Sequence, residues 1–190
     1  RTARTLESAE RLAIVAGSGA RAGNAPTYLR LLAERLQAPV LTTLKAKGAF
    51  PENHPLAMGP IGMHGHAEAN KIILEADCIV AVGARFSDRS VGRFDEFGKG
   101  MSIIHMDIDP AEIGKNKSVD VAHVGDVKSS LRTLVKLLAK KIAKRSADNP
   151  WLKRRKELVQ YYAENLKDYP REITARKSLK KLRELLPASG

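Results

Sequence analysis

The sequence predicts an α/β domain, a doubly wound parallel sheet of five to six strands with helices on both faces and a C-terminal helical linker. Short apolar runs alternate with longer helical patterns through residues 1–145, which is typical of such domains. The runs are continuously apolar, which indicates strands covered on both faces and hence a parallel sheet. Residues 146–190 carry helical patterns without strands.

Five apolar runs are predicted to be strands, and most of them end at a turn-forming residue. They are Leu12–Ala16, Val40–Thr43, Cys78–Val82, Ile103–Ile108 and Val119–Val124. Helices are predicted at Pro26–Leu36, Glu68–Glu75, Asp126–Ile142, Trp151–Leu166 and Ala175–Leu186. We interpret residues 1–145 as the α/β domain. We interpret residues 146–190 as a linker whose helices pack elsewhere in an intact protein and lead toward a further domain.

The formal net charge of +12 lies entirely in the C-terminal third of the chain. Residues 1–126 hold 15 basic and 15 acidic side chains, whereas residues 127–190 hold 18 basic and 6 acidic ones. This segment is poor in aromatic residues. We therefore interpret it as solvated helix faces, or as a surface that meets acidic parts of a larger protein, and expect no nucleic-acid partner.

Compartment and membrane association are addressed by two further observations. No apolar run approaches the length of a membrane span, so we expect no membrane partner. The single Cys78 excludes an internal disulfide and fits a reducing compartment, and its apolar neighbours predict a buried small hydrophobe. We expect a cytoplasmic protein, or one imported into an organelle by a segment cut from this N-terminus.

The first predicted strand is followed by a glycine-rich turn, Gly17-Ser18-Gly19 through Gly23. Glycines let a backbone approach a ligand closely, and backbone amides ahead of a helix bind phosphate well. The G-x-G-x-x-x-G spacing is one residue longer than the usual dinucleotide fingerprint, and the second strand ends in threonine instead of an acidic residue. Phosphate contact and a plain tight turn both remain open.

The loop Gly59–His66, which contains Gly62-Met63-His64, is too rich in glycine and proline to be a helix. Its polarisable Met63 and its His64 suit the side of a flat ring system, and the alternative is a capped loop. His64 and His66 have no carboxylate or thiol companion at metal-ligand spacing, so we predict no metal site in this chain.

Arginines follow the third predicted strand. Arg85 and Arg89 stand four apart, where they can pair with phosphate or carboxylate, although Asp88 and Arg89 also suit a simple surface pair.

Aspartates follow the next two strands. Asp107 and Asp109 can accept from ribose hydroxyls, or Asp109 caps a helix that starts at Pro110, and Asp126 is equally suited to cap the long basic helix. These spacings contain no catalytic triad or carboxylate pair. The loops therefore suit one elongated, phosphate-bearing ligand.

Five ordered blocks with matching separations resemble the central domain of the acetohydroxyacid synthase (acetolactate synthase) catalytic subunit. They are Pro39–Leu44, Lys47–Glu52, Gly62–Gly65, Val82–Phe86 and Ile104–Asn116, and the resemblance runs from about Arg11 to Ile142. Residues 174–187 resemble the stretch that leads into the third domain of that family.

The resemblance implies a three-domain subunit of a thiamine-diphosphate-dependent transferase. That enzyme joins two 2-oxo acids with loss of carbon dioxide in branched-chain amino acid biosynthesis. Its first and third domains bind thiamine diphosphate and Mg²⁺, and its central domain holds FAD, which has no net redox role. The implied partners are the remaining domains, further copies of the subunit and a regulatory subunit.

The resemblance also assigns site residues. FAD contacts are implied for Gly17, Ser18, Gly19, Thr43, Leu44, Lys45, Gly62, Met63, His64, Gly83, Ala84, Arg85, Asp107, Ile108, Glu112, Asn116, Gly125 and Asp126. Arg89, with Met63, is implied at the active-site entrance. The chain lacks the family's Gly-Asp-Gly and Asn-Asn motif for thiamine diphosphate and metal, so we expect no catalytic residue here and no activity of the isolated domain.

The sequence departs from the family pattern at three positions. Ser87 replaces a common Asp, which we expect to weaken a flavin contact or the position of its loop; Ser18 replaces a common Gly, and His66 a Thr or Cys. Two other hypotheses are a stand-alone nucleotide-binding or regulatory module, and the nucleotide-binding module of another thiamine-diphosphate-dependent carboligase or decarboxylase. The Gly62–Gly65 block together with Lys47 and Gly48 favours the synthase.

Overall fold

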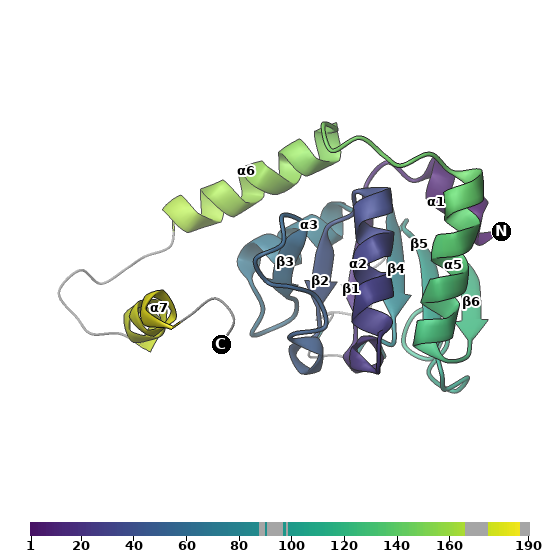
Figure 1. Cartoon of the computed structure of the whole chain (residues 1–190), viewed down its shortest axis with the longest axis horizontal. Coiled ribbons are helices and arrows are strands. Elements are labelled where there is room, and N and C mark those ends of the chain that lie inside the picture. Colours follow the sequence, from purple (N-terminus) through teal and green to yellow (C-terminus); the bar gives the residue numbers. More distant parts are fainter. Residues whose placement is uncertain (88–89, 91–96, 98, 166–174, 187–190) are drawn as a thin grey trace.

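The computed structural model describes residues 1–87, 90, 97, 99–165 and 175–186. Its six strands form one wholly parallel sheet in the order β3-β2-β1-β4-β5-β6 (Figure 1). The strands are β1 (Leu12–Ala16), β2 (Val40–Thr42), β3 (Ala57–Pro60), β4 (Cys78–Val82), β5 (Ser102–Asp107) and β6 (Val121–Val124). The helices are α1 (Thr2–Ser8), α2 (Ala25–Leu36), α3 (Ala67–Glu75), α5 (Val127–Lys141), α6 (Pro150–Glu164) and α7 (Ala175–Leu185), with 3₁₀ turns η1 (Ser18–Arg21) and η2 (Leu44–Ala46).

The order of the strands fixes where a ligand can bind. The chain runs outward from β1 through β2 to β3, then crosses back to β4 on the other side of β1 and continues to β6. The direction of winding therefore reverses between β1 and β4. In open parallel sheets, ligands bind beyond the carboxyl ends of the strands at this point of reversal.

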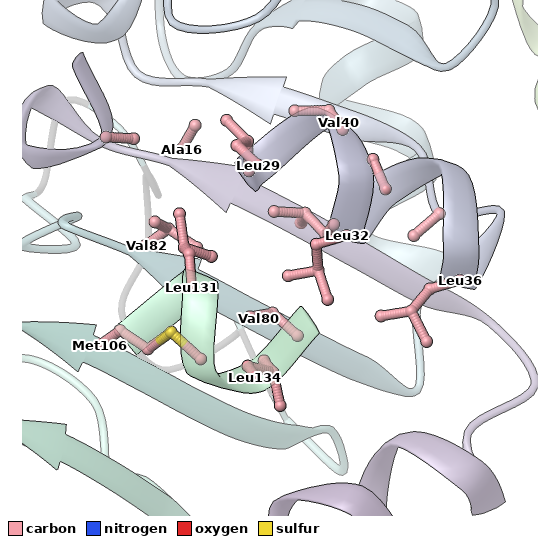
Figure 2. Close-up of a cluster of buried hydrophobic side chains, with 14 of the residues drawn as sticks. Ala16, Leu29, Leu32, Leu36, Val40, Val80, Val82, Met106, Leu131 and Leu134 are labelled. Atoms are coloured by element: carbon pink, nitrogen blue, oxygen red, sulfur yellow. The ribbon is translucent and has the colours of Figure 1, made fainter. Parts of the chain in front are cut away.

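Both faces of the sheet are covered, which confirms the predicted fold class. Alternate residues of β1 enter two separate cores, Leu12 and Ile14 on one face and Ala13 and Val15 on the other. Helices α1, α2 and α5 cover the first face, and α3 and α6 cover the second. Figure 2 shows the first core, where leucines of α2 and α5 lie over the strands; its labelled residues are Ala16, Leu29, Leu32, Leu36, Val40, Val80, Val82, Met106, Leu131 and Leu134.

Cys78 lies at the start of β4 with its side chain in this first core. Burial raises the pKa of its thiol to about 12, so the thiol is neutral at physiological pH. The residue is the buried small hydrophobe that its apolar neighbours predict.

Two elements were not predicted from the sequence. Strand β3 is short and contains Gly59 and Pro60, residues that rarely occur inside strands. It tolerates them because it pairs only with β2, at the edge of the sheet. Helix α1 is seven residues long, mostly polar, and buries only Thr2 and Leu6.

The expectation that the helices beyond residue 146 pack elsewhere is wrong for α6. This helix packs on α3, and its Trp151 is 5% exposed within the second core. The Trp151 indole N–H donates to the Leu12 carbonyl oxygen at 2.8 Å, beneath the sheet's central strand. The Arg154 guanidinium donates two hydrogen bonds of 2.9 Å to the Glu75 carboxylate. Helix α6 is thus part of the α/β layer structure.

Helix α7 differs from α6. Its leucines at positions 179, 182 and 185 are exposed. None of the helices in the described part of the chain is both long and apolar enough to cross a membrane.

We predict that the Glu75–Arg154 pair makes the stability of the fold depend on pH. The hydrogen bonds from Arg154 hold the pKa of Glu75 below its ordinary value of 4.5. A carboxyl with a lowered pKa stabilises the fold fully above its unfolded pKa, and this stabilisation is lost as the pH falls through its folded pKa. Because the pair is partly exposed, Glu75→Gln should lower the free energy of unfolding at neutral pH by at most about 1 kcal/mol.

Urea unfolding of the wild type and the variant, at neutral pH and well below pH 4.5, measures this effect. The difference between the two proteins should shrink in acid. A difference that is the same at both pH values contradicts the assignment.

Candidate cofactor-binding site

A cleft opens where the carboxyl ends of β1, β2, β3 and β4 meet. The residues that line it follow those four strands, and they are Gly17, Ser18, Thr43, Leu44, Lys45, Pro60, Ile61, His64, Gly83, Ala84, Arg85, Phe86, Ser87 and Ser90. The cleft therefore lies at the point where the winding of the sheet reverses.

The floor of the cleft is a close contact between two glycine turns. The Gly17 amide donates to the Val82 carbonyl at 2.8 Å, and the Gly19 amide donates to the Gly83 carbonyl at 3.2 Å. A Cβ on Gly17 would lie 2.5 Å from the Gly83 carbonyl carbon, and a Cβ on Gly83 would lie 2.6 Å from the Gly19 Cα. Only glycine fits this crossing. Gly19 contributes its hydrogen bond to the Gly83 carbonyl but does not line the cleft.

The electrostatics of the cleft favour an anion. Lys45 and Arg85 line it and are exposed, and Arg21 donates to the Lys45 carbonyl oxygen at 3.2 Å. Within the described part of the chain, no Asp or Glu lines the cleft. Cations beside a glycine turn suit a phosphate-bearing ligand.

The loop between β3 and α3 brings only one of its three predicted site residues into the lining of the cleft. His64 lines the cleft, but Met63 is 79% exposed beside it. Both backbone groups of Gly62 are hydrogen-bonded to Asn70, so Gly62 is turned toward the protein. The described residues contain no group of three His, Cys, Asp or Glu side chains placed to hold a metal ion.

The loop after β4 carries a strained aromatic residue. Phe86 has a φ of 48° and is buried, with its ring 5.3 Å from the His105 ring. The hydroxyl oxygens of Ser87 and Ser90 lie 3.1 Å apart, within hydrogen-bond distance. Arg89, the predicted entrance residue, and Asp88 lie outside the described residues.

His105 was overlooked at the sequence level because it occupies one position of an apolar strand. It is 1% exposed, and neither ring nitrogen has a well-formed hydrogen bond among the described residues, although the Ala84 backbone lies close enough to favour the charged form. Burial lowers the pKa of its imidazole, and this effect outweighs the attraction of Asp107. This shift favours the neutral imidazole, whose ring packs edge to face with Phe86.

The residues implied at the adenosine end lie beside the cleft. Asp107 is buried at the end of β5, and its carboxylate accepts from the Asp109 amide at 3.0 Å. Asp109 accepts from the Ala111 amide at 2.9 Å in a turn. No helix starts at Pro110, so the predicted helix cap at Asp109 is wrong.

The same surface holds the other residues implied at that end. Ile108 is exposed, and Glu112 pairs with Lys115 at 3.2 Å. The Asn116 side-chain amide donates to the Arg85 carbonyl oxygen at 2.9 Å, which joins this surface to the cleft.

The end of β6 continues this edge of the sheet. The Gly125 amide donates to the Asp107 carbonyl oxygen at 2.9 Å. The Asp126 carboxylate accepts from the Ser129 amide at 2.8 Å, and this hydrogen bond lowers the pKa of Asp126. Asp126 is thus the N-cap of α5, one of the two roles that its position predicted.

The structure therefore gathers half of the predicted residues in one cleft, namely Gly17, Ser18, Thr43, Leu44, Lys45, His64, Gly83, Ala84 and Arg85. It adds Pro60, Ile61, Phe86, Ser87 and Ser90. Pro60 and Ile61 were missed because they lie at the end of β3, a short edge strand that the sequence pattern did not predict.

A six-stranded parallel sheet wound outward from β1, with a cationic cleft at the reversal, defines the class of doubly wound α/β domains. Comparison with known families is more specific. Residues 1–134 match the family described as thiamine pyrophosphate enzyme, central domain. The chain belongs to this family.

Curated relatives agree with this assignment. The chain is 47% identical over 150 residues to an acetolactate synthase large subunit of Parasynechococcus marenigrum, covering 78% of this chain and 24% of that protein. It is 43% identical over 187 residues to a probable acetolactate synthase large subunit of Methanocaldococcus jannaschii, covering 98% and 31%. A Methanococcus aeolicus relative with the same description is 45% identical over 161 residues, covering 85% and 26%. The chain thus spans between 24% and 31% of the length of these relatives.

Proposed function

We propose that this chain is the FAD-binding central domain of an acetolactate synthase, whose whole protein joins two 2-oxo acids with loss of carbon dioxide. The observation that carries the FAD proposal is the glycine crossing of Gly17 and Gly83, with Lys45 and Arg85 beside it. A backbone floor without side chains lets an elongated ligand lie close to the sheet, and the cations suit its diphosphate. The relatives support a synthase over another carboligase or a stand-alone module.

The cleft is small for such a ligand. Its volume is about 210 Å³, whereas complete small-molecule sites measure roughly 300–1,000 Å³. We propose that the other domains of the parent cover the rest of FAD and that they bind thiamine diphosphate and Mg²⁺. The exposed leucines of α7 fit a segment, within residues 146–190, that continues toward such a domain.

The residues have distinct proposed roles. Gly17, Ser18 and Gly83 approach the ligand through the backbone, and His64 with Leu44 lies along its ring and ribityl portion. Asp107, Ile108, Glu112, Asn116, Gly125 and Asp126 provide the surface for its adenosine end, beside the cleft. Arg89 and Met63 stand at the substrate entrance of the parent. The proposed chemistry of the parent takes place on thiamine diphosphate, so no residue of this chain is assigned a catalytic role.

We propose further that the parent is a cytoplasmic homo-oligomer that works with a regulatory subunit. The relatives are named large subunits, which supports the proposal of a second, regulatory subunit.

Flavin titration tests the proposed cofactor. The full-length protein should bind FAD, and Lys45→Ala should weaken binding by about 5-fold, because it removes a cation from the cleft. Lys47→Ala is the matched control, since Lys47 is also exposed but pairs with Glu52 at 2.6 Å outside the cleft.

The isolated chain should bind FAD far more weakly than the full-length protein, because fewer contacts remain to offset an association cost of roughly 4–15 kcal/mol. Quenching of FAD fluorescence measures the affinity of the full-length wild type, of its Lys45→Ala and Lys47→Ala variants, and of the isolated chain. Equal affinities of the two lysine variants, or no binding by the full-length protein, contradict the proposal.

A further inference from the structure

The loop between β3 and α3 folds back on itself beside the cleft. The Gly65 amide donates to the Gly62 carbonyl oxygen at 3.0 Å, and the His66 amide donates to the Pro60 carbonyl oxygen at 2.8 Å. A Cβ on Gly65 would lie 2.6 Å from the Ile61 carbonyl carbon, so the loop is as tight as its backbone permits. Within it, Pro60, Ile61 and His64 line the cleft.

One side chain holds the apex of this loop from outside the cleft. Asn70 is half-buried in the first turns of α3, and it does not line the cleft. Its Oδ1 accepts from the Gly62 amide at 2.8 Å, and its Nδ2 donates to the Gly62 carbonyl oxygen at 2.9 Å. The Asn70 side chain thus binds both backbone groups of a single residue, which fixes the rotation of that residue as well as its position.

Gly62 has a φ of 102°, which glycine adopts readily, so its hydrogen bonds to Asn70 select this orientation from several that are open to it. Turned this way, Gly62 directs its amide and carbonyl toward α3, and His64 two residues later lies in the cleft. Asparagine is the side chain that matches an amide and a carbonyl together, since it carries one acceptor and one donor group. Alanine removes both bonds, and aspartate keeps the acceptor but sets a negative oxygen against the Gly62 carbonyl.

We propose that Asn70 is a positioning residue for the cofactor site. It holds the 60–66 loop so that Ile61 and His64 face the cleft, and this inference rests on the proposed flavin function. Asn70 touches no ligand in this scheme, and its effect passes through the orientation of Gly62.

The test uses the full-length protein in three forms, namely Asn70→Ala, Asn70→Asp and the control Glu75→Gln. Glu75 lies in the last turn of the same helix and accepts hydrogen bonds from Arg154 of α6. Its replacement therefore weakens the packing of α3 on α6 and changes no contact of the loop. The first measurement is amide hydrogen exchange of peptides that span residues 60–66 in the flavin-free protein. Exchange should rise about 10-fold in both Asn70 variants and stay at the wild-type rate in Glu75→Gln.

The second measurement is the affinity for FAD. Both Asn70 variants should bind FAD about 10-fold more weakly than the wild type, and Glu75→Gln should bind it as the wild type does. Should the alanine variant fail to fold, the aspartate variant, which keeps one of the two bonds, decides the question.

The two measurements separate this inference from the function on which it rests. Unchanged exchange in the Asn70 variants overturns the positioning role, whatever the flavin result. Raised exchange with unchanged FAD affinity also overturns it, because the loop would then move without consequence for the ligand. A wild-type protein that binds no FAD overturns the proposed function. The exchange data would still show whether the hydrogen bonds between Asn70 and Gly62 hold the loop.

Discussion

Replacing Gly17 with alanine should lower the free energy of unfolding by about 3 kcal/mol or more, because the new Cβ has no space. It would lie 2.5 Å from the Gly83 carbonyl carbon, which belongs to the backbone and cannot rotate away as a side chain can. The two turns must separate, and this breaks the hydrogen bond from the Gly19 amide to the Gly83 carbonyl. Because the crossing is the floor of the cleft, flavin affinity should fall together with stability.

Gly23→Ala is the matched control for this change. Gly23 belongs to the same glycine-rich turn, but a Cβ there meets nothing within 4 Å. Its φ of 49° leaves only the cost of a left-handed alanine, about 1 kcal/mol. Thermal unfolding should show a drop in Tm of about 6–12 °C for Gly17→Ala and about a third of that for Gly23→Ala. Equal drops would mean that the two turns do not cross as described.

Replacing Trp151 with alanine should destabilise the fold by about 3–5 kcal/mol, which is typical for removal of a large buried aromatic side chain. The indole is almost fully buried between α6 and the sheet, and it supplies the hydrogen bond to the Leu12 carbonyl oxygen. The variant loses apolar contact and leaves that oxygen without its donor. Chemical denaturation of the chain measures the loss.

Trp151→Phe separates the two contributions. Phenylalanine keeps most of the apolar area but has no N–H, so the loss should be about 1–2 kcal/mol. A wild-type stability for Trp151→Ala would show instead that α6 does not pack on the sheet and that residues 146–190 are a linker throughout.

The sequence predicted the site unevenly, for physical reasons. Gly17, Lys45 and Gly83 lie within three residues of the ends of buried strands, and the carboxyl ends of parallel strands meet at one edge, so their convergence followed from the fold class. Asn70 gave no such signal, because a polar residue on a short helix is unremarkable until its partner Gly62 is known. His105 was hidden in the same way, since its burial and its ring contact with Phe86 exist only in the packed core.

The fold shows the same division. The sequence by itself determined the parallel sheet, because strands covered on both faces must be apolar throughout. It also determined the five strands that were predicted from apolar runs and the main helices. Only the tertiary structure decided that β3 adds an edge strand and that α6 joins the second core. Those outcomes depend on contacts between residues far apart in the chain, such as Trp151 with Leu12 and Arg154 with Glu75, which no local pattern of hydrophobicity records.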